Sequence, residues 1–461
     1  MYKYLPLFVL LCIGISCFAQ INDGKNNVTN SESPFSVTSE SSFTGIISNK
    51  ENVPFWMHTN TNDAIAERTN LSVSEDLKLR YSFGNSFLEA GAAYFIRDGV
   101  QNSFQRRDLY LSYQNTWLKA TLGAKASDIE FDGLSSTNKN FLLSTNARPL
   151  PGIVIEAAKP IKISSTFGID WGIGQYYLNE EDRYVQNVKV HYKRLGLITK
   201  FNENNILTTR IQHYAQWGGT SPEFGKLASS FAAFVDVFFA KKTNETNIEG
   251  ERVNALGNHL GSYFLEYEYK TQIGEFSFYH EHPFEDGSGT RLANFPDGVW
   301  GISFREKKPT WFSAILYEFS TTVDQSGKPS RSGGDNYFRN GLYRNGWTYD
   351  GNVIGFPFIL IDTSIKINEN TTQIIGSRVQ VHHLGIAGKI KNIDWKIKTT
   401  YSKNLGTYGG KFIPPLKNWY NYVSLKYKTE KIGAITIMGG MDISNFESKL
   451  LAGGLTYSYN F

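Results

Sequence analysis

Cysteine is almost absent from this chain. Its 461 residues include two, Cys12 and Cys17, and both lie within residues 1–19. This segment starts with Lys3, continues with an apolar run over 5–15 and ends on small residues, which predicts a secretory signal peptide. Its removal leaves no cysteine, which excludes a disulfide scaffold, a thiolate metal site and a cysteine enzyme. Lipoprotein processing at Cys17 is the alternative, but the residues before it form a poor lipobox.

Net charge and long apolar runs are also scarce. The 47 Lys and Arg residues nearly balance the 43 Asp and Glu residues, for a formal charge of +4. This balance argues against nucleic acid as a partner. After residue 19 the most apolar stretch is 231–240, which Asp236 interrupts. A membrane-spanning helix needs about 20 apolar residues, so the sequence predicts none.

Aromatic residues and glycine are abundant instead, with 32 Phe, 26 Tyr, 9 Trp and 42 Gly. A closed antiparallel barrel crosses a membrane with aromatic girdles and with strands that are apolar outside and polar inside. A secreted β-sandwich or a multidomain secreted enzyme shares part of this composition. The strand pattern and the connection lengths must therefore discriminate between a barrel, a sandwich and a multidomain enzyme.

Five hairpins place the apolar residues of both their strands on one face, as side-chain alternation requires. In the first, a two-residue loop at 115–116 pairs Leu109 with Leu122 and Leu111 with Ala120. The other four hairpins turn near residues 203–205, 271–274, 306–309 and 391–394. The opposite faces carry Glu, Lys, Arg, Gln and Ser, which suit a wet lumen better than a sandwich core.

Long connections alternate with these tight turns, at about 126–152, 218–260, 284–298, 322–353 and 404–418. Outer-membrane barrels have short periplasmic turns and long extracellular loops. At about 25 residues for each strand with its share of connections, we expect an all-β, closed antiparallel transmembrane barrel of roughly 16–18 strands, with 18 favoured. The amphipathic last strand ends on Phe461, which indicates recognition by the barrel assembly machinery.

Two segments do not have a strand pattern. Residues 20–52 are rich in Asn, Ser and Thr and predict a flexible polar leader, so that the single barrel domain covers 53–461. Over 221–242, Ser221 can cap a helix, Pro222 suits its first position, and apolar residues follow on one stripe. We expect this helix on the loop side, packed into the barrel mouth or lumen as a plug. A helix that docks a partner is the alternative.

The densest polar cluster is His280, Glu281, His282, Glu285 and Asp286, with Arg291 in the loop that follows. His280 and His282 share one strand face. The nitrogen and oxygen ligands suit a metal, but no standard metal-site spacing matches and Pro283 interrupts the strand. Contact with a ligand and a lumenal hydrogen-bond network are the other interpretations. No cofactor is predicted.

The connection at 322–353 holds a second group of candidate binding residues, namely Asp335, Asn336, Tyr337, Tyr343, Arg344, Trp347 and Tyr349. Aromatic faces stack on sugar rings while Asp, Asn and Arg bind hydroxyls, so this composition favours a carbohydrate platform. A self-packed lid that closes the barrel explains it nearly as well. Arg148, in a third loop group at 144–151, fits an ion pair with an acidic loop residue or contact with an anionic glycan.

Four short motifs, in this order, resemble the capsule assembly family typified by Wzi: Pro54-Phe55-Trp56, residues 144–151, residues 280–289 and residues 332–337. The resemblance extends over nearly the whole chain after the signal peptide. It implies an eighteen-stranded outer-membrane barrel that acts as a lectin, holds capsular or related polysaccharide on the cell exterior and catalyses no reaction. It also implies a helical bundle that helps to close the barrel. No binding motif transfers residue by residue.

The favoured hypothesis is a non-catalytic barrel in the outer membrane of a Gram-negative cell, in contact with outer-membrane lipids and with surface polysaccharide. A saccharide-conducting porin is the alternative, suggested by the polar lumenal faces. An outer-membrane enzyme that uses the 280–286 cluster is a third; no Gly-x-Ser-x-Gly motif supports a catalytic triad. The candidate glycan-binding residues are Arg148, His280, Glu281, His282, Asp286, Arg291, Asp335, Tyr337, Tyr343, Arg344, Trp347 and Tyr349.

Overall fold

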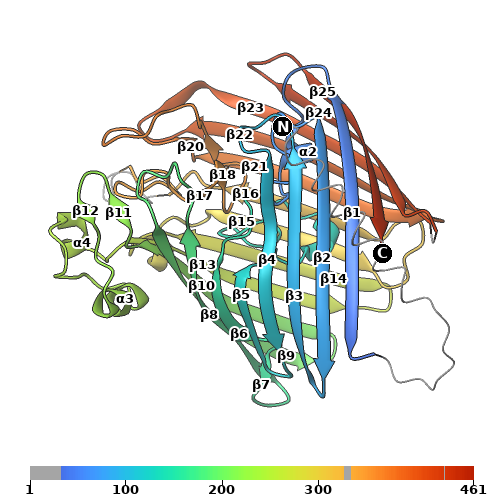
Figure 1. Ribbon diagram of the computed structural model, residues 1–461, viewed down its shortest axis with the longest axis horizontal. Helices are drawn as coiled ribbons and strands as arrows, with labels where there is room; N and C mark the ends of the chain where they lie inside the picture. The colour runs from blue at the N-terminus through green and yellow to red at the C-terminus, as the bar shows by residue number, and fades with distance from the viewer. Residues whose placement is uncertain (1–32, 326–333, 430) are drawn as a thin grey trace.

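The computed structural model describes residues 33–325, 334–429 and 431–461, so the expected signal peptide and the first part of the leader lie outside the described residues. Eighteen long antiparallel strands form one closed sheet, in which β25 pairs with β1 (Figure 1). A nineteenth, very short strand, β7 (Ile161–Lys162), pairs with β8 beyond the end of β6. The strand number and the closed antiparallel architecture predicted from the sequence are confirmed.

The wall consists of β1 (Phe35–Ser48), β2 (Leu71–Phe83), β3 (Ser86–Arg97), β4 (Phe104–Gln114), β5 (Leu118–Ala124), β6 (Gly152–Ala157), β8 (Phe167–Leu178), β9 (Val188–Asn202), β10 (Asn205–Trp217), β13 (Asn258–Lys270), β14 (Gly274–Phe284), β15 (Gly298–Glu306), β16 (Ala314–Thr321), β21 (Val379–Ile390), β22 (Ile393–Gly406), β23 (Lys411–Lys428), β24 (Ala434–Ser444) and β25 (Leu450–Asn460). The loops add the short pairs β11 (Thr220–Ser221) with β12 (Gly225–Lys226), β17 (Thr348–Tyr349) with β18 (Asn352–Val353), and β19 (Leu360–Ile361) with β20 (Ile374–Gly376). The helices are α2 (Phe55–His58), α3 (Phe231–Phe238) and α4 (Glu249–Val253), with single 3₁₀ turns at Glu130–Gly133 and Gly289–Arg291.

Alternation along the strands gives the wall an apolar outside and a polar inside. On β4, Leu109 and Leu111 are about half exposed on the outer face, whereas Asp108 and Ser112 are buried on the inner one. Such an apolar outer surface suits contact with lipid. In addition, a closed barrel satisfies every backbone hydrogen bond within the sheet, as the membrane interior requires. Within the described ranges, no helix is both long and apolar enough to cross a membrane.

The register of the β4–β5 hairpin differs from the expected one by two residues. Leu111 pairs with Leu122 and Leu109 with Ala124. The side chain of Asn115 accepts hydrogen bonds from the backbone N–H groups of Trp117 and Leu118, which widens the loop beyond two residues. A shift by two leaves every side chain on its expected face, so the inside–outside prediction for this hairpin is confirmed.

The flexible leader expected at 20–52 is wrong for its second half. Residues 35–48 form β1, which pairs with β2 over eleven positions and with β25 over nine, and so closes the barrel. On the inner face of this strand, Ser42 and Thr44 share hydrogen bonds with Ser74 and Thr456. Ser39 and Ser41, in contrast, lie on the outer face and donate to Glu75. A polar strand that pairs on both edges needs few apolar residues of its own.

Two of the expected long connections have different bounds. The 322–353 connection extends to residue 378 and contains four short strands. The expected connection at 404–418 shrinks to 407–410, because β23 starts at Lys411 and runs through Pro414 and Pro415. These prolines precede Asn418, where the pairing of β23 with β24 begins, and proline is tolerated in a strand where no ladder partner needs its N–H.

The helix expected over 221–242 is shorter and lies elsewhere. Residues 220–226 form the β11–β12 hairpin, and α3 begins after Ser230, whose hydroxyl accepts a hydrogen bond from the N–H of Ala233 at 3.0 Å. The helix is on the loop side as expected, at one side of the molecule in Figure 1. It packs on Trp217 and His191, which alternate with lumenal residues and therefore lie on the outer face of the wall. The expected position in the barrel mouth or lumen is thus wrong.

Loop segments, not a helix, fill the lumen. Residues 134–143 run down inside the wall, where Leu134 accepts a hydrogen bond from lumenal His383 and Glu318 accepts hydrogen bonds from Ser135 and from the N–H of Ser136. Residues 336–359 pack against this segment, with Phe338 and Phe356 in contact with Phe141. The resulting core contains mainly loop aromatics and the inner residues of the strands that face them.

Candidate functional site

A cleft of about 860 Å³ opens on the loop side of the barrel. Four loop regions and three strand ends line it: residues 52–68 after β1, residues 99–101 after β3, Asn146, residues 350–363, and the loop-side ends of β23, β24 and β25. We refer to this space as the loop-side cleft.

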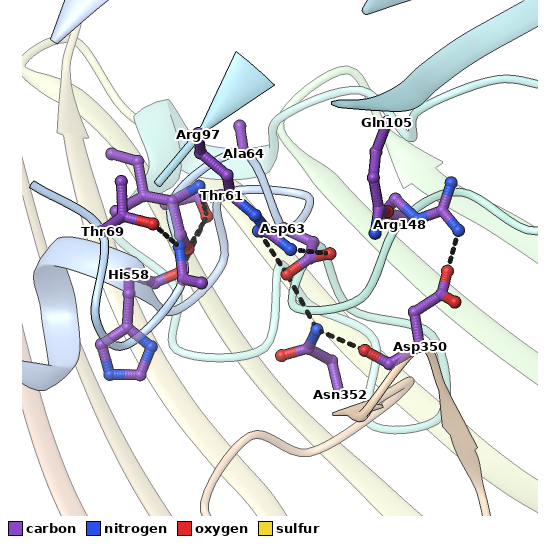
Figure 2. Close-up of polar contacts among 12 residues, drawn as sticks. His58, Thr61, Asp63, Ala64, Thr69, Arg97, Gln105, Arg148, Asp350 and Asn352 are labelled. Atoms are coloured by element: carbon purple, nitrogen blue, oxygen red, sulfur yellow. Dashed lines mark hydrogen bonds and ion pairs between the residues drawn. The ribbon is translucent and has the colours of Figure 1, made fainter. Parts of the chain in front are cut away.

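A buried ion pair forms one wall of this cleft. Both guanidinium nitrogens of Arg97 donate to the two carboxylate oxygens of Asp63, at 2.6 and 2.8 Å, and the side-chain amide of Asn352 donates to the same carboxylate at 2.9 Å (Figure 2). Asp63 and Arg97 are 3% and 4% exposed. Burial raises the pKa of Asp63, and Arg97 opposes that effect.

Local sequence explains how Asp63 reaches this position. Asn60, Asn62 and Asp63 all have positive φ, between 52° and 64°. Asn and Asp adopt this left-handed region more readily than other non-glycine residues. The tight turns fold residues 59–70 back under the barrel mouth, where the hydroxyl of Thr61 donates to the carbonyl of His58 at 2.8 Å (Figure 2).

A second ion pair lies beside the first. Arg148 contacts the carboxylate of Asp350, and its other terminal nitrogen donates to the carbonyl of Arg106 at 3.0 Å. Its guanidinium also lies over the ring of Tyr349, 5.3 Å from the centroid. The expected pairing of Arg148 with an acidic loop residue is confirmed. Because Arg148 is occupied in this way, it offers little to an anionic glycan.

The opposite wall combines aromatic rings with a free carboxylate oxygen. Phe55 stacks on Tyr420 with ring centroids 4.3 Å apart, and its N–H donates to Asp442 Oδ2 at 2.8 Å. Asp442 Oδ1 is buried and has no hydrogen-bond partner among the residues that the structure describes. Asn418 donates to the Tyr420 hydroxyl at 2.8 Å. Because Asp442 also lines the cleft, a rotation of its carboxylate would present this oxygen to a hydroxyl group there.

The lining of the loop-side cleft is acidic. It includes the five carboxyl groups of Asp63, Glu67, Asp350, Asp442 and Glu447 but only the two guanidinium groups of Arg68 and Arg97. Burial lowers the pKa of His58 to about 4 and raises the pKa of Glu67. His58 is therefore neutral at neutral pH. This lining disfavours a strongly anionic ligand.

The histidines of the 280–286 cluster lie on the outside of the barrel. His280 and His282 share one face, as expected, but it is the outer face of β14, where His280 stacks on Trp300 at 3.7 Å. Glu281 points the other way, into the lumen, where it accepts hydrogen bonds from Ser262 at 2.7 Å and from the N–H of Phe141 at 2.8 Å. The lumenal network interpretation thus holds for Glu281 and is wrong for both histidines.

The remaining charged candidates are dispersed. Asp286 accepts the N–H groups of Ser288 and Gly289 and so shapes its own turn. Arg291 and Asp335 are exposed in different loops. Arg344 lies 3.8 Å from Glu223 on another part of the rim. No single site brings these residues together.

The aromatic candidates of the 322–378 connection are in the interior. Tyr337, Tyr343, Trp347 and Tyr349 are at most 2% exposed. The indole nitrogen of Trp347 donates to the carbonyl of Leu142 at 2.6 Å, and the Tyr349 hydroxyl donates to Asn179 at 2.8 Å. These rings have no face on which a sugar can stack. The arrangement corresponds to the lid interpretation and not to the surface platform.

No metal site is evident in the described part of the chain. Over 33–325, 334–429 and 431–461, no three His, Cys, Asp or Glu side chains are grouped as metal ligands. The loop-side cleft offers hydrogen-bond donors, acceptors and aromatic edges, which are the groups that bind hydroxyl-rich ligands.

Sequence reasoning missed most of this cleft. Asp63, Arg97, Asn352, Asn418 and Asp442 lie far apart in the sequence, and no motif connects them. One signal was present, since the Pro54-Phe55-Trp56 motif contains the ring that stacks on Tyr420.

Comparisons with known proteins bear on the fold. No protein-family model matches the chain, and no curated protein matches it. Among solved structures, the chain is similar to Wzi, described as an outer-membrane protein of Escherichia coli involved in group 1 capsule assembly and as a carbohydrate-binding β-barrel. The TM-score is 0.58 at 12% identity, over 92% of this chain and 84% of Wzi.

Two barrels from Pseudomonas aeruginosa are also similar. OccK3 (OpdO) has a TM-score of 0.51 at 10% identity, over 93% of this chain and 95% of OccK3. OpdL has a TM-score of 0.50 at 8% identity, over 93% and 98%. At these identities the similarities establish an outer-membrane-type β-barrel fold that Wzi and the Occ and Opd proteins share.

Proposed function

We propose that this protein is a non-catalytic outer-membrane barrel that binds surface polysaccharide in the loop-side cleft and helps to hold or assemble it on the cell exterior. The observation that carries the proposal is the cleft itself: a polar, partly aromatic space at the mouth of the barrel, with the unpartnered Oδ1 of Asp442 beside the Phe55–Tyr420 stack. The similarity to Wzi, a carbohydrate-binding barrel, supports it at the level of the fold.

The chemistry of the cleft favours a particular class of sugar. Its carboxylates and side-chain amides accept and donate hydrogen bonds to hydroxyl groups, while the ring edges contact the apolar faces of pyranoses. Of the two guanidinium groups in the lining, Arg97 is already bound to Asp63, so the cleft offers little to a polyanion. We therefore expect a ligand rich in neutral or amino sugars.

A direct binding measurement tests this proposal. Purified cell-surface polysaccharide, cut to oligosaccharides, is titrated by calorimetry into the detergent-solubilised protein and into Asp442→Ala and Asn418→Ala variants. Wild type should bind, and each variant should lose several-fold in affinity, since a hydrogen bond contributes about 0.5–1.5 kcal/mol. Tyr343→Phe, a change buried in the lid, is the matched control and should bind as wild type does. Equal affinity in all four proteins contradicts the proposal.

A conducting channel for saccharides is the second candidate. One observation favours it: lumenal Arg80 is still 47% exposed while it donates to Glu89 at 3.0 Å, so the inner face near the turn end of β2 and β3 is accessible to water. The OccK3 and OpdL barrels share the fold. Against it, loop residues such as Leu134 and Trp347 fill the lumen between the other strands.

Single-channel recording separates the two candidates. In planar bilayers, a binding barrel closed by its loops should give no steps of conductance at neutral pH. Steady open-channel conductance that saccharides block would support the porin instead. The interaction of the terminal Phe461 strand with the barrel assembly machinery stays a prediction, as does the export signal.

A further inference from the structure

An apolar groove of about 790 Å³ runs along the outer wall of the barrel, over β8, β9, β10, β13 and β14. Outward side chains form its floor, among them Leu195, Leu197, Ile211 and Leu265. The loop after β14 overhangs it, with Leu292 and Phe295 about half exposed. The function proposed above makes no use of this surface.

The position of the groove restricts what can occupy it. Its floor belongs to the lipid-facing band, because Leu195 and Leu197 are 57% and 41% exposed on the outer face of β9. At this depth the surroundings are hydrocarbon, and an acyl chain is the natural occupant. A soluble protein segment at the same depth would leave backbone groups without hydrogen-bond partners.

Basic residues mark the loop end of this groove. Lys193 is the next outward residue above Leu195 on β9; its ammonium donates to the carbonyl of Phe238 and lies over that ring, which leaves its other N–H donors for a phosphate. Arg291 directly follows Thr290, which lines the groove. Lys241 and Lys242 follow α3 and are exposed. The exposed acidic residue of the overhanging loop, Asp286, is already engaged by backbone N–H groups. The charge at this end is therefore complementary to phosphate.

Helix α3 has the composition of a segment at a membrane interface. Its inner face covers Trp217 and His191, yet Phe231 and Phe239 are 82% and 60% exposed. Aromatic side chains next to lysines are typical of helices that lie at the boundary between headgroups and acyl chains. The helix thus lies beside Lys193, at the loop end of the wall that carries the groove.

We propose that this outer-wall groove binds one phosphorylated, multiply acylated lipid of the outer leaflet. The acyl chains lie over Leu195, Ile211 and Leu265, and the phosphates contact Lys193 and Arg291. These two residues are separated by three strand spacings, or about 14 Å, so a headgroup with two separated phosphates reaches both. The proposal rests on the outer-membrane location proposed above but not on polysaccharide binding.

Native mass spectrometry of the detergent-solubilised full chain tests this site. The probes are diphosphoryl lipid A, monophosphoryl lipid A and phosphatidylethanolamine. Diphosphoryl lipid A should bind with one-to-one stoichiometry and about tenfold more tightly than either other lipid. The double variant Lys193→Gln/Arg291→Gln should abolish that preference, and Ile211→Trp, which fills the groove, should weaken all binding.

Matched controls lie on the opposite wall. Lys417→Gln removes an exposed basic residue near the loop-side end of β23, and Ile397→Trp enlarges an outward side chain of β22; both should bind lipid A as wild type does. Heat-modifiable migration in gels confirms that each variant is folded. Equal binding of the three lipids, or unchanged binding by the groove variants, overturns the proposal, whatever the outcome with polysaccharide.

Discussion

Two parts of the loop layer, residues 49–70 and 336–359, meet at the same cleft but have opposite compositions. The second is crowded with aromatic residues, and its largest rings, at Tyr343 and Trp347, are buried. The first is mostly polar, and Phe55, Asp63 and Glu67 line the open space. The difference shows that the dense group of loop aromatics forms the buried core of the loop layer, while scattered polar residues packed on that core line the open cleft.

The largest expected effect comes from the buried aromatic loop, residues 336–359. Trp347→Ala removes a fully buried indole and its hydrogen bond to Leu142, and changes of this kind cost about 3–5 kcal/mol. We expect hydrogen exchange to accelerate across 134–143 and 336–359 while the wall strands stay protected. Trp117→Ala, at an exposed turn position, is the control and should change neither segment. Protection that is the same in both variants would show that the aromatic loop does not stabilise the loop layer.

The next largest effect is expected at the buried Asp63–Arg97 ion pair, which holds the polar segment 49–70. Asp63→Asn leaves the Arg97 guanidinium buried without its counter-charge, which costs about 3 kcal/mol. Residues 59–70 should lose exchange protection and polysaccharide affinity together. The double variant Asp63→Asn/Arg97→Met should recover part of the protection. If Asp350→Asn, at the more exposed pair, has the larger effect, the first pair does not organise the cleft.

A smaller effect is expected at the aromatic wall of the cleft. Phe55→Ala removes the ring that stacks on Tyr420, and aromatic pairs contribute about 0.5–1.5 kcal/mol beyond their buried area. Calorimetry should show a decrease in oligosaccharide affinity of several-fold. Phe55→Tyr keeps the ring and should bind nearly as wild type does. A decrease of the same size in Phe55→Tyr would assign the effect to loop distortion.

The effect of pH comes last, because it is absent at neutral pH. Burial lowers the pKa of His58 to about 4, from an ordinary value of 6.5, so the locally unfolded segment binds a proton more readily than the folded one. The order of residues 53–65 is therefore complete above about pH 6.5 and is lost progressively as the pH falls towards 4. Exchange rates between pH 7 and pH 4.5, corrected for intrinsic chemistry, measure it. His58→Gln should remove this dependence, and an unchanged pH profile in that variant would contradict the assignment.

The wall of the barrel was predictable from the sequence because alternation records which face of each strand meets lipid. Leu109 and Leu111 kept their outward orientation even though the hairpin register moved by two residues. The same rule placed His280 and His282 on one face but did not say which. Their partners Trp300 and Leu265 face outward, and that pairing decides the matter.

The loop layer was less predictable because its contacts are between distant segments. Asp442 meets Phe55 across 387 positions, and Asn352 meets Asp63 across 289. A polar strand such as β1 resembles a disordered leader until its two neighbours are known. The length of the α3 helix depended on where the β11–β12 hairpin ended, and local capping residues at 221 and 230 did not distinguish the two starts.

The most direct test of the account is the hydrogen-exchange footprint of an oligosaccharide from the cell-surface polysaccharide, bound to the solubilised protein. The account predicts new protection in residues 52–68 and 350–353 and near Asp442, with none in the 286–291 loop. Protection confined to 286–291, or no protection anywhere on the loop side, would contradict the claim that the loop-side cleft binds the sugar.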